Sequence, residues 1–279
     1  MKYIDTFVDV IDNYDLFIVD VWGVVHNDGV KTFEGVIDLL QEIQNREKHL
    51  HFLSNSPGSA KEVKEALFNI GIEEKYYDDV HTSGEETRLL LTSHELGVGN
   101  NCFVIDETRG IIDGTFIKEE SNLDNADFVL ASGIKSRLDL GVYDNLLTEI
   151  KSRNLKMICP NPDIIVKTIE GELFCPGAIA KKYEDLGGDV TYIGKPYSKV
   201  YDRIFHKYTF TKDRIIGIGD GPYTDIMGAN NFGIDSALVI ETGILATKFF
   251  ISNNIDKKSL GTYLDNIKIH PKYIIKRFF

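Results

Sequence analysis

The 279-residue sequence predicts an α/β fold built on a parallel sheet, and two patterns support this prediction. Short apolar runs bounded by polar residues are typical of buried strands. They alternate with longer stretches whose apolar residues recur every three or four positions, which is typical of amphipathic helices. This alternation indicates βαβ units, in which helices cover both faces of a parallel sheet.

The expected elements follow one another from residue 16 to residue 240. The predicted strands are residues 16–19, 50–53, 127–132, 155–159, 190–194, 214–219 and 235–240. The helical patterns occupy residues 33–45, 59–71, 142–154, 176–188, 198–208 and 223–233. The helix at 59–71 begins at a serine that suits an N-cap and ends at a glycine that suits the C-terminal end of a helix.

The composition excludes several classes of partner. Hydrophobic residues make up 43% of the chain, enough for a sizeable core, and the formal net charge is -12. An acidic surface repels nucleic-acid phosphates and anionic lipids, so neither is expected as a partner. No apolar run approaches the ~20 residues that a membrane helix needs. Four acids in the first fifteen residues leave no room for a secretory segment, so a soluble cytoplasmic protein is expected.

The three cysteines are Cys102, Cys159 and Cys175. They are widely separated, odd in number and form no CxxC pair. We therefore expect buried, reduced thiols rather than a zinc site or disulfides.

Four of the predicted strands end in reactive polar residues. These residues are Asp20, Ser54 with Asn55, Lys195, and Asp220 with Asp225. Each of them alone suits an ordinary helix cap or turn. Ligands of parallel sheets bind at the carboxyl ends of the strands, however, so the joint set favours a single functional site.

This set of side chains supports phosphoryl transfer. A carboxylate can attack phosphorus and form an aspartyl phosphate. Two or three carboxylates can hold Mg²⁺, which prefers oxygen ligands and neutralises charge between an anionic nucleophile and an anionic phosphate. A lysine, a serine hydroxyl and backbone N–H groups can hold the remaining phosphoryl oxygens.

Five motifs in a fixed order carry a family resemblance: "SNSPGS", "PNPD", "FCPGAIAKKYEDLGG", "IGKP" and "GDGPYTDIMGA". From about residue 15 to residue 240 the chain resembles the haloacid dehalogenase superfamily, and within it the NagD-like, class IIA phosphatases. The resemblance implies a Rossmann-like core, residues 1–80 and 189–279, with an inserted α/β cap of the C2 type at residues 81–188. It also implies a homodimer formed through the cap as one possibility.

The resemblance further implies a Mg²⁺-dependent phosphatase that acts on a small phosphorylated metabolite through an aspartyl phosphate. By this resemblance, Asp20 is the nucleophile and a metal ligand, and Trp22 is a metal ligand through its backbone carbonyl. Asp220 is a direct metal ligand, and Asp225 either binds the metal through water or orients the other ligands. Ser54 with Asn55 binds the phosphoryl group, and Lys195 stabilises the nucleophile and the phosphoryl group.

Trp22 is a departure from the family pattern Asp-x-Asp, in which the second aspartate protonates the leaving group and then activates water. An indole cannot do this acid–base work, which is typically worth ~10²–10⁴-fold in rate, or about 2.7–5.4 kcal/mol. Three interpretations follow. The protein is a phosphatase that either acts on good leaving groups or uses another acid, or it is a phosphotransferase, or it binds phosphorylated metabolites without catalysis. We expect the first, because the nucleophile, lysine, serine and both metal-site acids are all present.

Three further features have alternative interpretations. His26 is the nearest ionisable candidate for a replacement acid, although a structural imidazole is favoured. Asp163 in "PNPD" suits either the substrate cleft or a turn. The basic, aromatic tail at residues 268–279 is expected to form a surface helix or a partner contact.

Overall fold

The computed structural model describes residues 1–168 and 171–279, which form two compact units. The first unit comprises Met1–Ser54, Lys64–His81 and Tyr201–Phe279, and the second comprises Asn55–Val63 and Thr82–Val200. Each unit is built around its own parallel sheet with helices between the strands. The predicted α/β fold class is confirmed.

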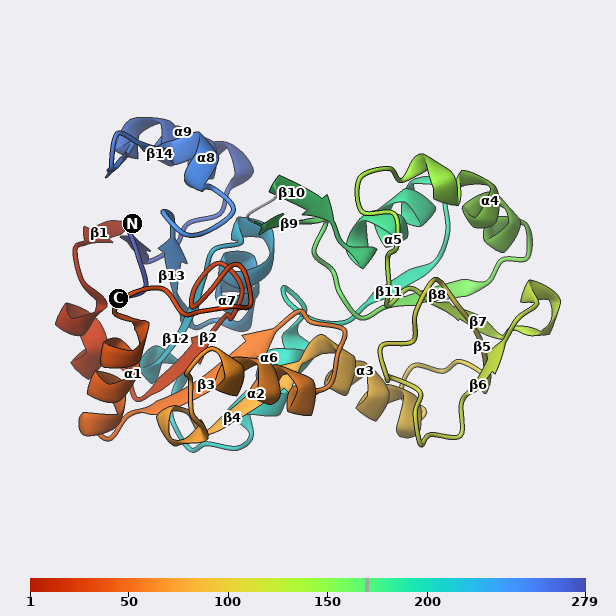
Figure 1. The fold of residues 1–279 in the computed structure, drawn as a ribbon, viewed down its shortest axis with the longest axis horizontal. Coiled ribbons are helices and arrows are strands. Elements are labelled where there is room, and N and C mark those ends of the chain that lie inside the picture. The colour runs from red at the N-terminus through yellow and green to blue at the C-terminus, as the bar shows by residue number, and fades with distance from the viewer. Residues whose placement is uncertain (169–170) are drawn as a thin grey trace. The chain divides into compact units, whose positions relative to one another are not determined.

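The first unit contains a seven-stranded sheet with the order β1-β16-β13-β12-β2-β3-β4 (Figure 1). Its strands are β1 (Lys2–Ile4), β2 (Leu16–Val19), β3 (His49–Ser54), β4 (Asp79–Thr82), β12 (Ile215–Gly219), β13 (Asp235–Val239) and β16 (Tyr273–Ile275). The central strand β2 is buried along its whole length and pairs in parallel with β12 and β3. In register, Val19 lies between Ile218 and Phe52, so these strands end at the same edge.

The helices of this part of the chain are α1 (Val36–Asn45), α2 (Ala60–Asn69), α6 (Ser198–Phe205), α7 (Met227–Phe232), α8 (Ala246–Phe249) and α9 (Lys257–Ile267). Four of them, α1, α2, α6 and α7, fall within predicted helical patterns, whereas α8 and α9 were not predicted. Helix α1 buries Val36, Leu39, Leu40 and Ile43, whose spacing places them on one face. Shorter elements are the 3₁₀ turns Phe7–Asn13, Glu74–Tyr76 and Lys212–Arg214, the π-helical turn Pro222–Ile226, and the hairpin of β14 (Phe250–Ile251) and β15 (Asn254–Ile255).

The second unit contains a five-stranded sheet with the order β11-β8-β7-β5-β6. Its strands are β5 (Asn101–Val104), β6 (Lys118–Glu120), β7 (Phe128–Leu130), β8 (Lys156–Cys159) and β11 (Val190–Tyr192). Its helices are α3 (Ser83–Thr92), α4 (Asp144–Ser152) and α5 (Pro176–Asp185), and its 3₁₀ turns are Leu123–Asn125 and Gly141–Tyr143. Strands β9 (Ile165–Thr168) and β10 (Gly171–Phe174) form a separate antiparallel pair.

Strand β11 pairs in parallel with β8, with Val190 opposite Met157. This pairing agrees with the assignment of residues 190–192 to the second unit. The predicted division into a core at residues 1–80 and 189–279 and a cap at residues 81–188 stays a prediction.

The three cysteines are free thiols and all are buried, as predicted. Burial raises the pKa of each thiol to about 12, so Cys102, Cys159 and Cys175 are uncharged near neutral pH. Among the described residues, no helix combines the length and the apolar character needed to cross a bilayer.

The prediction of a surface helix at residues 268–279 is wrong. Residues 273–275 form β16, which pairs in parallel with both β1 and β13. Tyr273, Ile274 and Ile275 are buried in the sheet, and Phe278 beyond them is 0% exposed. Three consecutive apolar residues just after a proline suit a short buried strand better than a helix, and the basic residues around them hid this signal.

A buried histidine in β3 has an unusual environment. His51 is 0% exposed, and neither ring nitrogen has a hydrogen-bond partner among the described residues. Burial, together with the charge of Lys207, lowers the pKa of His51 to about 3. Asp79 opposes this effect, while His81 and Lys64 add to it. His51 is therefore neutral in the folded chain at every pH at which the protein is expected to work.

The buried His51 predicts acid-dependent stability. Between pH 6.5 and about 3 the unfolded chain binds a proton at this imidazole that the folded chain excludes. The free energy of unfolding should therefore fall with decreasing pH, by roughly 1.4 kcal/mol per pH unit from this one group. Urea unfolding across this range should show a shallower pH dependence for His51→Phe than for wild type. The exposed-site control His206→Gln should follow wild type, and equal slopes for wild type and His51→Phe would contradict the assignment.

Candidate active site

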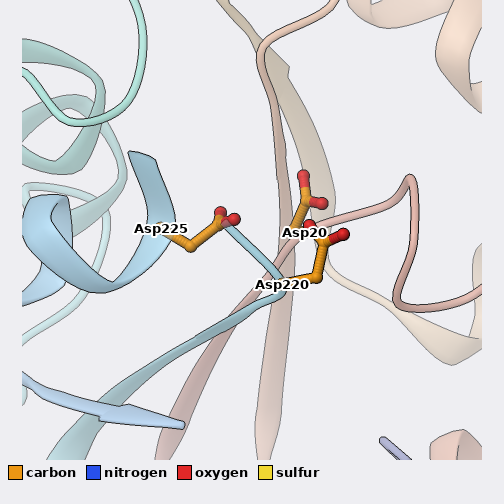
Figure 2. A group of neighbouring side chains, drawn as sticks. All are labelled: Asp20, Asp220 and Asp225. Carbon is orange, nitrogen blue, oxygen red and sulfur yellow. The ribbon is translucent and has the colours of Figure 1, made fainter. Parts of the chain in front are cut away.

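Three carboxylates meet at the carboxyl ends of the central strands of the first unit (Figure 2). Asp20 follows β2, Asp220 follows β12, and Asp225 lies in the π-helical turn Pro222–Ile226. Each offers an oxygen atom, and these three oxygens lie within 4.8 Å of one another. The structure thus brings together the two strand-end aspartates and the acid that follows them in "GDGPYTDI".

Asp20 is held in place by the sheet itself. Its backbone N–H donates to the carbonyl of Ile218 at 2.8 Å, which continues the pairing of β2 with β12. The residue is only 8% exposed. A carboxylate this buried is costly unless opposite charge or hydrogen bonds compensate it, and a bound cation supplies opposite charge.

Asp220 fits between two glycines. A Cβ atom on Gly23 would lie 2.3 Å from Oδ2 of Asp220, and one on Gly243 would lie 2.3 Å from its Cβ. Gly23 also has a φ of 80°, a conformation that glycine adopts without strain. The N–H of Ile244 donates to Oδ2 of Asp220 at 2.7 Å. Backbone therefore surrounds this carboxylate where side chains would displace it.

Asp225 is 5% exposed and is fixed by similar means. The N–H of Gly221 donates to its Oδ2 at 3.0 Å. A Cβ atom on Gly219 would lie 2.0 Å from its Cγ, so only glycine leaves room for this carboxylate. The turn that carries Asp225 is π-helical, a rare geometry that occurs frequently at functional sites.

Comparison with known proteins identifies the family. The family described as haloacid dehalogenase-like hydrolase matches residues 17–111, and a second, described as HAD-hydrolase-like, matches residues 192–248. The crystal structure of a haloacid dehalogenase-like hydrolase from Brucella suis 1330 has 30% sequence identity and a TM-score of 0.83. The similarity covers 99% of this chain and 100% of that one. The chain belongs to the haloacid dehalogenase-like family.

Two further relatives carry specific names. The acid sugar phosphatase of Staphylococcus haemolyticus is 24% identical over 241 residues, which cover 83% of this chain and 87% of that protein. The 4-nitrophenylphosphatase of Schizosaccharomyces pombe is 24% identical over 262 residues, which cover 84% of this chain and 86% of that protein. The prediction that this haloacid dehalogenase-like protein is a hydrolase is confirmed.

Trp22 packs against His26 in the loop that follows Asp20. The two rings meet edge to face, with centroids 5.0 Å apart, and the N–H of Gly23 donates to the carbonyl of His26 at 2.7 Å. The N–H of Gly29 donates to Nδ1 of His26 at 3.1 Å, and burial lowers the pKa of this imidazole. A neutral ring that accepts a backbone hydrogen bond has a structural role, which is the alternative favoured from the sequence.

Ser54 is the last residue of β3 and is buried. Because β3 pairs in parallel with β2, Ser54 lies at the same edge of the sheet as Asp20. Its predicted role in binding the phosphoryl group stays a prediction.

Asn55 and Lys195 lie in the second unit, where the side chain of Asn55 organises its surroundings. Its Oδ1 accepts from the N–H of Lys195 at 2.7 Å and from the hydroxyl of Ser83 at 3.0 Å. Its Nδ2 donates to the carbonyl of Lys195 at 3.1 Å and to Oδ1 of Asp163 at 2.9 Å. These four bonds use the hydrogen-bonding capacity of the carboxamide, so Asn55 orients the backbone of Lys195.

Asp163 was assigned either to the substrate cleft or to a turn. Its N–H donates to Oδ1 of Asn161 at 3.0 Å, and its carboxylate accepts from Asn55. Both bonds lie within the second unit, so the observed contacts of Asp163 are those of a turn residue that supports Asn55.

Sequence reasoning missed the turn at residues 242–244. The hydroxyl of Thr242 donates to the carbonyl of Gly23 at 2.6 Å, and Gly243 and Ile244 form one wall around Asp220. The sequence offered one indication that this turn belongs to the site, because residues 242–244 come shortly after the predicted strand at 235–240. The carboxyl end of that strand reaches the same edge as those of the other parallel strands.

Proposed function

We propose that this haloacid dehalogenase-like hydrolase is a Mg²⁺-dependent phosphatase of small organic phosphate monoesters. The observation that carries the proposal is the convergence of Asp20, Asp220 and Asp225 at the carboxyl edge of a parallel sheet. The names of the two relatives described above, an acid sugar phosphatase and a 4-nitrophenylphosphatase, support a phosphate ester as substrate.

The acids of this cluster suit Mg²⁺. The ion binds oxygen ligands, keeps several waters and is typically held by one or two carboxylates. Asp20 and Asp220 would be direct ligands together with the backbone carbonyl of Trp22, and Asp225 would bind through water or orient the others. When bound, the ion neutralises the charge that would otherwise repel an anionic phosphate.

In the proposed reaction, a carboxylate oxygen of Asp20 attacks phosphorus. The bond between phosphorus and the leaving-group oxygen breaks, and its electron pair departs with that oxygen. Water then attacks the aspartyl phosphate, loses a proton to solvent, and releases inorganic phosphate with the Asp20 carboxylate restored. Ser54 and Lys195 are proposed to hold the phosphoryl oxygens in both steps.

Trp22 sets the class of leaving group in this proposal. The indole N–H at the position of the family's acid–base aspartate is not acidic enough to protonate a leaving group, and the neutral, backbone-bonded His26 does not replace that acid. A leaving oxygen that departs without protonation must itself be a stable anion. Aryl phosphates therefore fit the site better than alkyl phosphates.

The central test is hydrolysis of p-nitrophenyl phosphate. Wild type with Mg²⁺ should release phosphate, and Asp20→Asn should lose at least ~10⁴-fold of that activity because the nucleophile is removed. The matched control Asp38→Asn changes an exposed aspartate of α1 and should keep wild-type activity.

The same assay separates a hydrolase from a non-catalytic binder. If wild type and Asp20→Asn share one background rate while Mg²⁺ with phosphate still raises the melting temperature, the protein is a binder of phosphometabolites. That pair of results would overturn the proposal.

The role of Trp22 is tested by Trp22→Asp. Restoring a carboxyl group should raise turnover of an alkyl phosphate by up to ~10²-fold, and of an aryl phosphate by much less, because only the alkyl leaving group needs protonation. Trp22→Phe keeps an aromatic ring without an acid and should leave the alkyl-to-aryl ratio of turnover unchanged. An equal effect of Trp22→Asp on both substrates would show that leaving-group protonation is not the missing step.

A further inference from the structure

In the first unit, an ion pair connects the segments that directly follow β13 and β16. Arg277 donates from Nε to Oε2 of Glu241 at 2.6 Å and from a terminal nitrogen to Oε1, so the pair is bidentate. Lys276 adds a second cation 3.5 Å from the same carboxylate. The backbone N–H of Glu241 donates to the carbonyl of Lys276 at 2.9 Å, which extends the pairing of β13 with β16. The carboxylate of Glu241 is 14% exposed.

Glu241 directly precedes the turn that holds Asp220. Within the next three residues, the hydroxyl of Thr242 bonds the carbonyl of Gly23, Gly243 lies against Asp220, and the N–H of Ile244 donates to the Asp220 carboxylate at 2.7 Å. The placement of this N–H depends on how the backbone leaves β13. The ion pair holds that backbone at Glu241, the second residue beyond the strand.

Arg277 is itself anchored by the two residues that follow it. Phe278 is 0% exposed and packs against Phe7, with ring centroids 5.9 Å apart. Phe279 occupies the space over Gly35, where a Cβ atom would lie 2.7 Å from its ring. The guanidinium of Arg277 lies 5.5 Å from the centre of the Phe279 ring. The cation of the pair therefore has a fixed position.

We propose that Arg277 and Glu241 are positioning residues of the metal site. A bidentate, partly buried pair of arginine and carboxylate has one preferred geometry, and here it sets the path of residues 242–244. That path presents the Ile244 N–H and the Gly243 backbone to Asp220 and keeps the carboxylate aimed at the cation. The inference rests on the proposed function, in which Asp220 is a ligand of a divalent cation.

A second ion pair joins the same two strands at their other ends. Lys272 precedes β16, Asp235 begins β13, and their charged groups are 2.5 Å apart. Neutralising either Lys272 or Arg277 removes one positive charge and one ion pair between the segments of β13 and β16. Only Arg277 is linked through its partner to the turn around Asp220. Lys272→Gln is therefore the matched control for Arg277→Gln.

The experiment is a Mg²⁺ titration of the full chain. Trp22 is the only tryptophan in the sequence and lies two residues after Asp20, so its fluorescence reports the metal site directly. Calorimetry supplies a second, independent measure of affinity. Groups that orient metal ligands typically affect affinity by ~10–100-fold, so Arg277→Gln and Glu241→Gln should each weaken Mg²⁺ binding by at least ~10-fold. Lys272→Gln should stay within about twofold of wild type.

Activity adds a readout that a purely structural pair would not give. Turnover of Arg277→Gln and Glu241→Gln should be low at limiting Mg²⁺ and recover largely at saturating Mg²⁺. Glu241→Gln keeps the size of the side chain and serves as the measured variant if Arg277→Gln does not fold.

Three results would overturn the inference. Unchanged Mg²⁺ affinity in the folded variants, while wild type binds the ion, would overturn it and leave the proposed function standing. Equal weakening by Lys272→Gln and Arg277→Gln would show a general effect of stability. Absence of Mg²⁺ binding by wild type would overturn the proposed function first, and this inference with it.

Discussion

Mutual repulsion among three carboxylates is the constraint on which the rest of the first unit depends. Asp20, Asp220 and Asp225 bring oxygen atoms within 4.8 Å of one another, and two of the three residues are less than 9% exposed. Two unit charges at that separation repel by about 3.5 kcal/mol at an effective dielectric constant of 20. The ionised cluster is therefore favoured when a divalent cation is bound, which connects the geometry of the sheet to phosphate chemistry.

Backbone groups of the surrounding structure hold the cluster in place. Parallel pairing of β2 with β12 places two of the acids at neighbouring strand ends. Gly219 and Gly243 lie where a Cβ atom would collide with a carboxylate side chain, and the N–H groups of Gly221 and Ile244 donate to Asp225 and Asp220. Backbone groups positioned before a ligand arrives need no reorganisation when it binds, which favours both metal affinity and catalysis.

Much of this arrangement was predictable from local sequence. The strands at residues 16–19 and 214–219 were predicted because apolar runs end abruptly on an aspartate, and the parallel topology then placed both acids at one edge. Strand β16 was not predicted because three apolar residues in a basic tail are too short a signal without their partner strands. Its burial comes from pairing with β1 and β13, which are far away in the sequence.

The parts of the site that were missed depend on long-range contacts. The predicted role of Asn55 in phosphoryl binding beside Ser54 stays a prediction. Its side chain bonds Ser83, Asp163 and Lys195, which no local pattern connects to it. Likewise, nothing in residues 242–244 alone indicates that they surround Asp220. The proposed departure of Trp22 from an Asp-x-Asp pattern is the opposite case, because it rests on the sequence alone.

The central claim is that the three aspartates form one site for a divalent cation, and anomalous X-ray scattering from crystals grown with Mn²⁺ tests it most directly. The account predicts a single strong anomalous peak within bonding distance of carboxylate oxygens of Asp20 and Asp220, with Asp225 beside it. A map without a peak among these three residues, at a Mn²⁺ concentration that occupies weak surface sites, would contradict it.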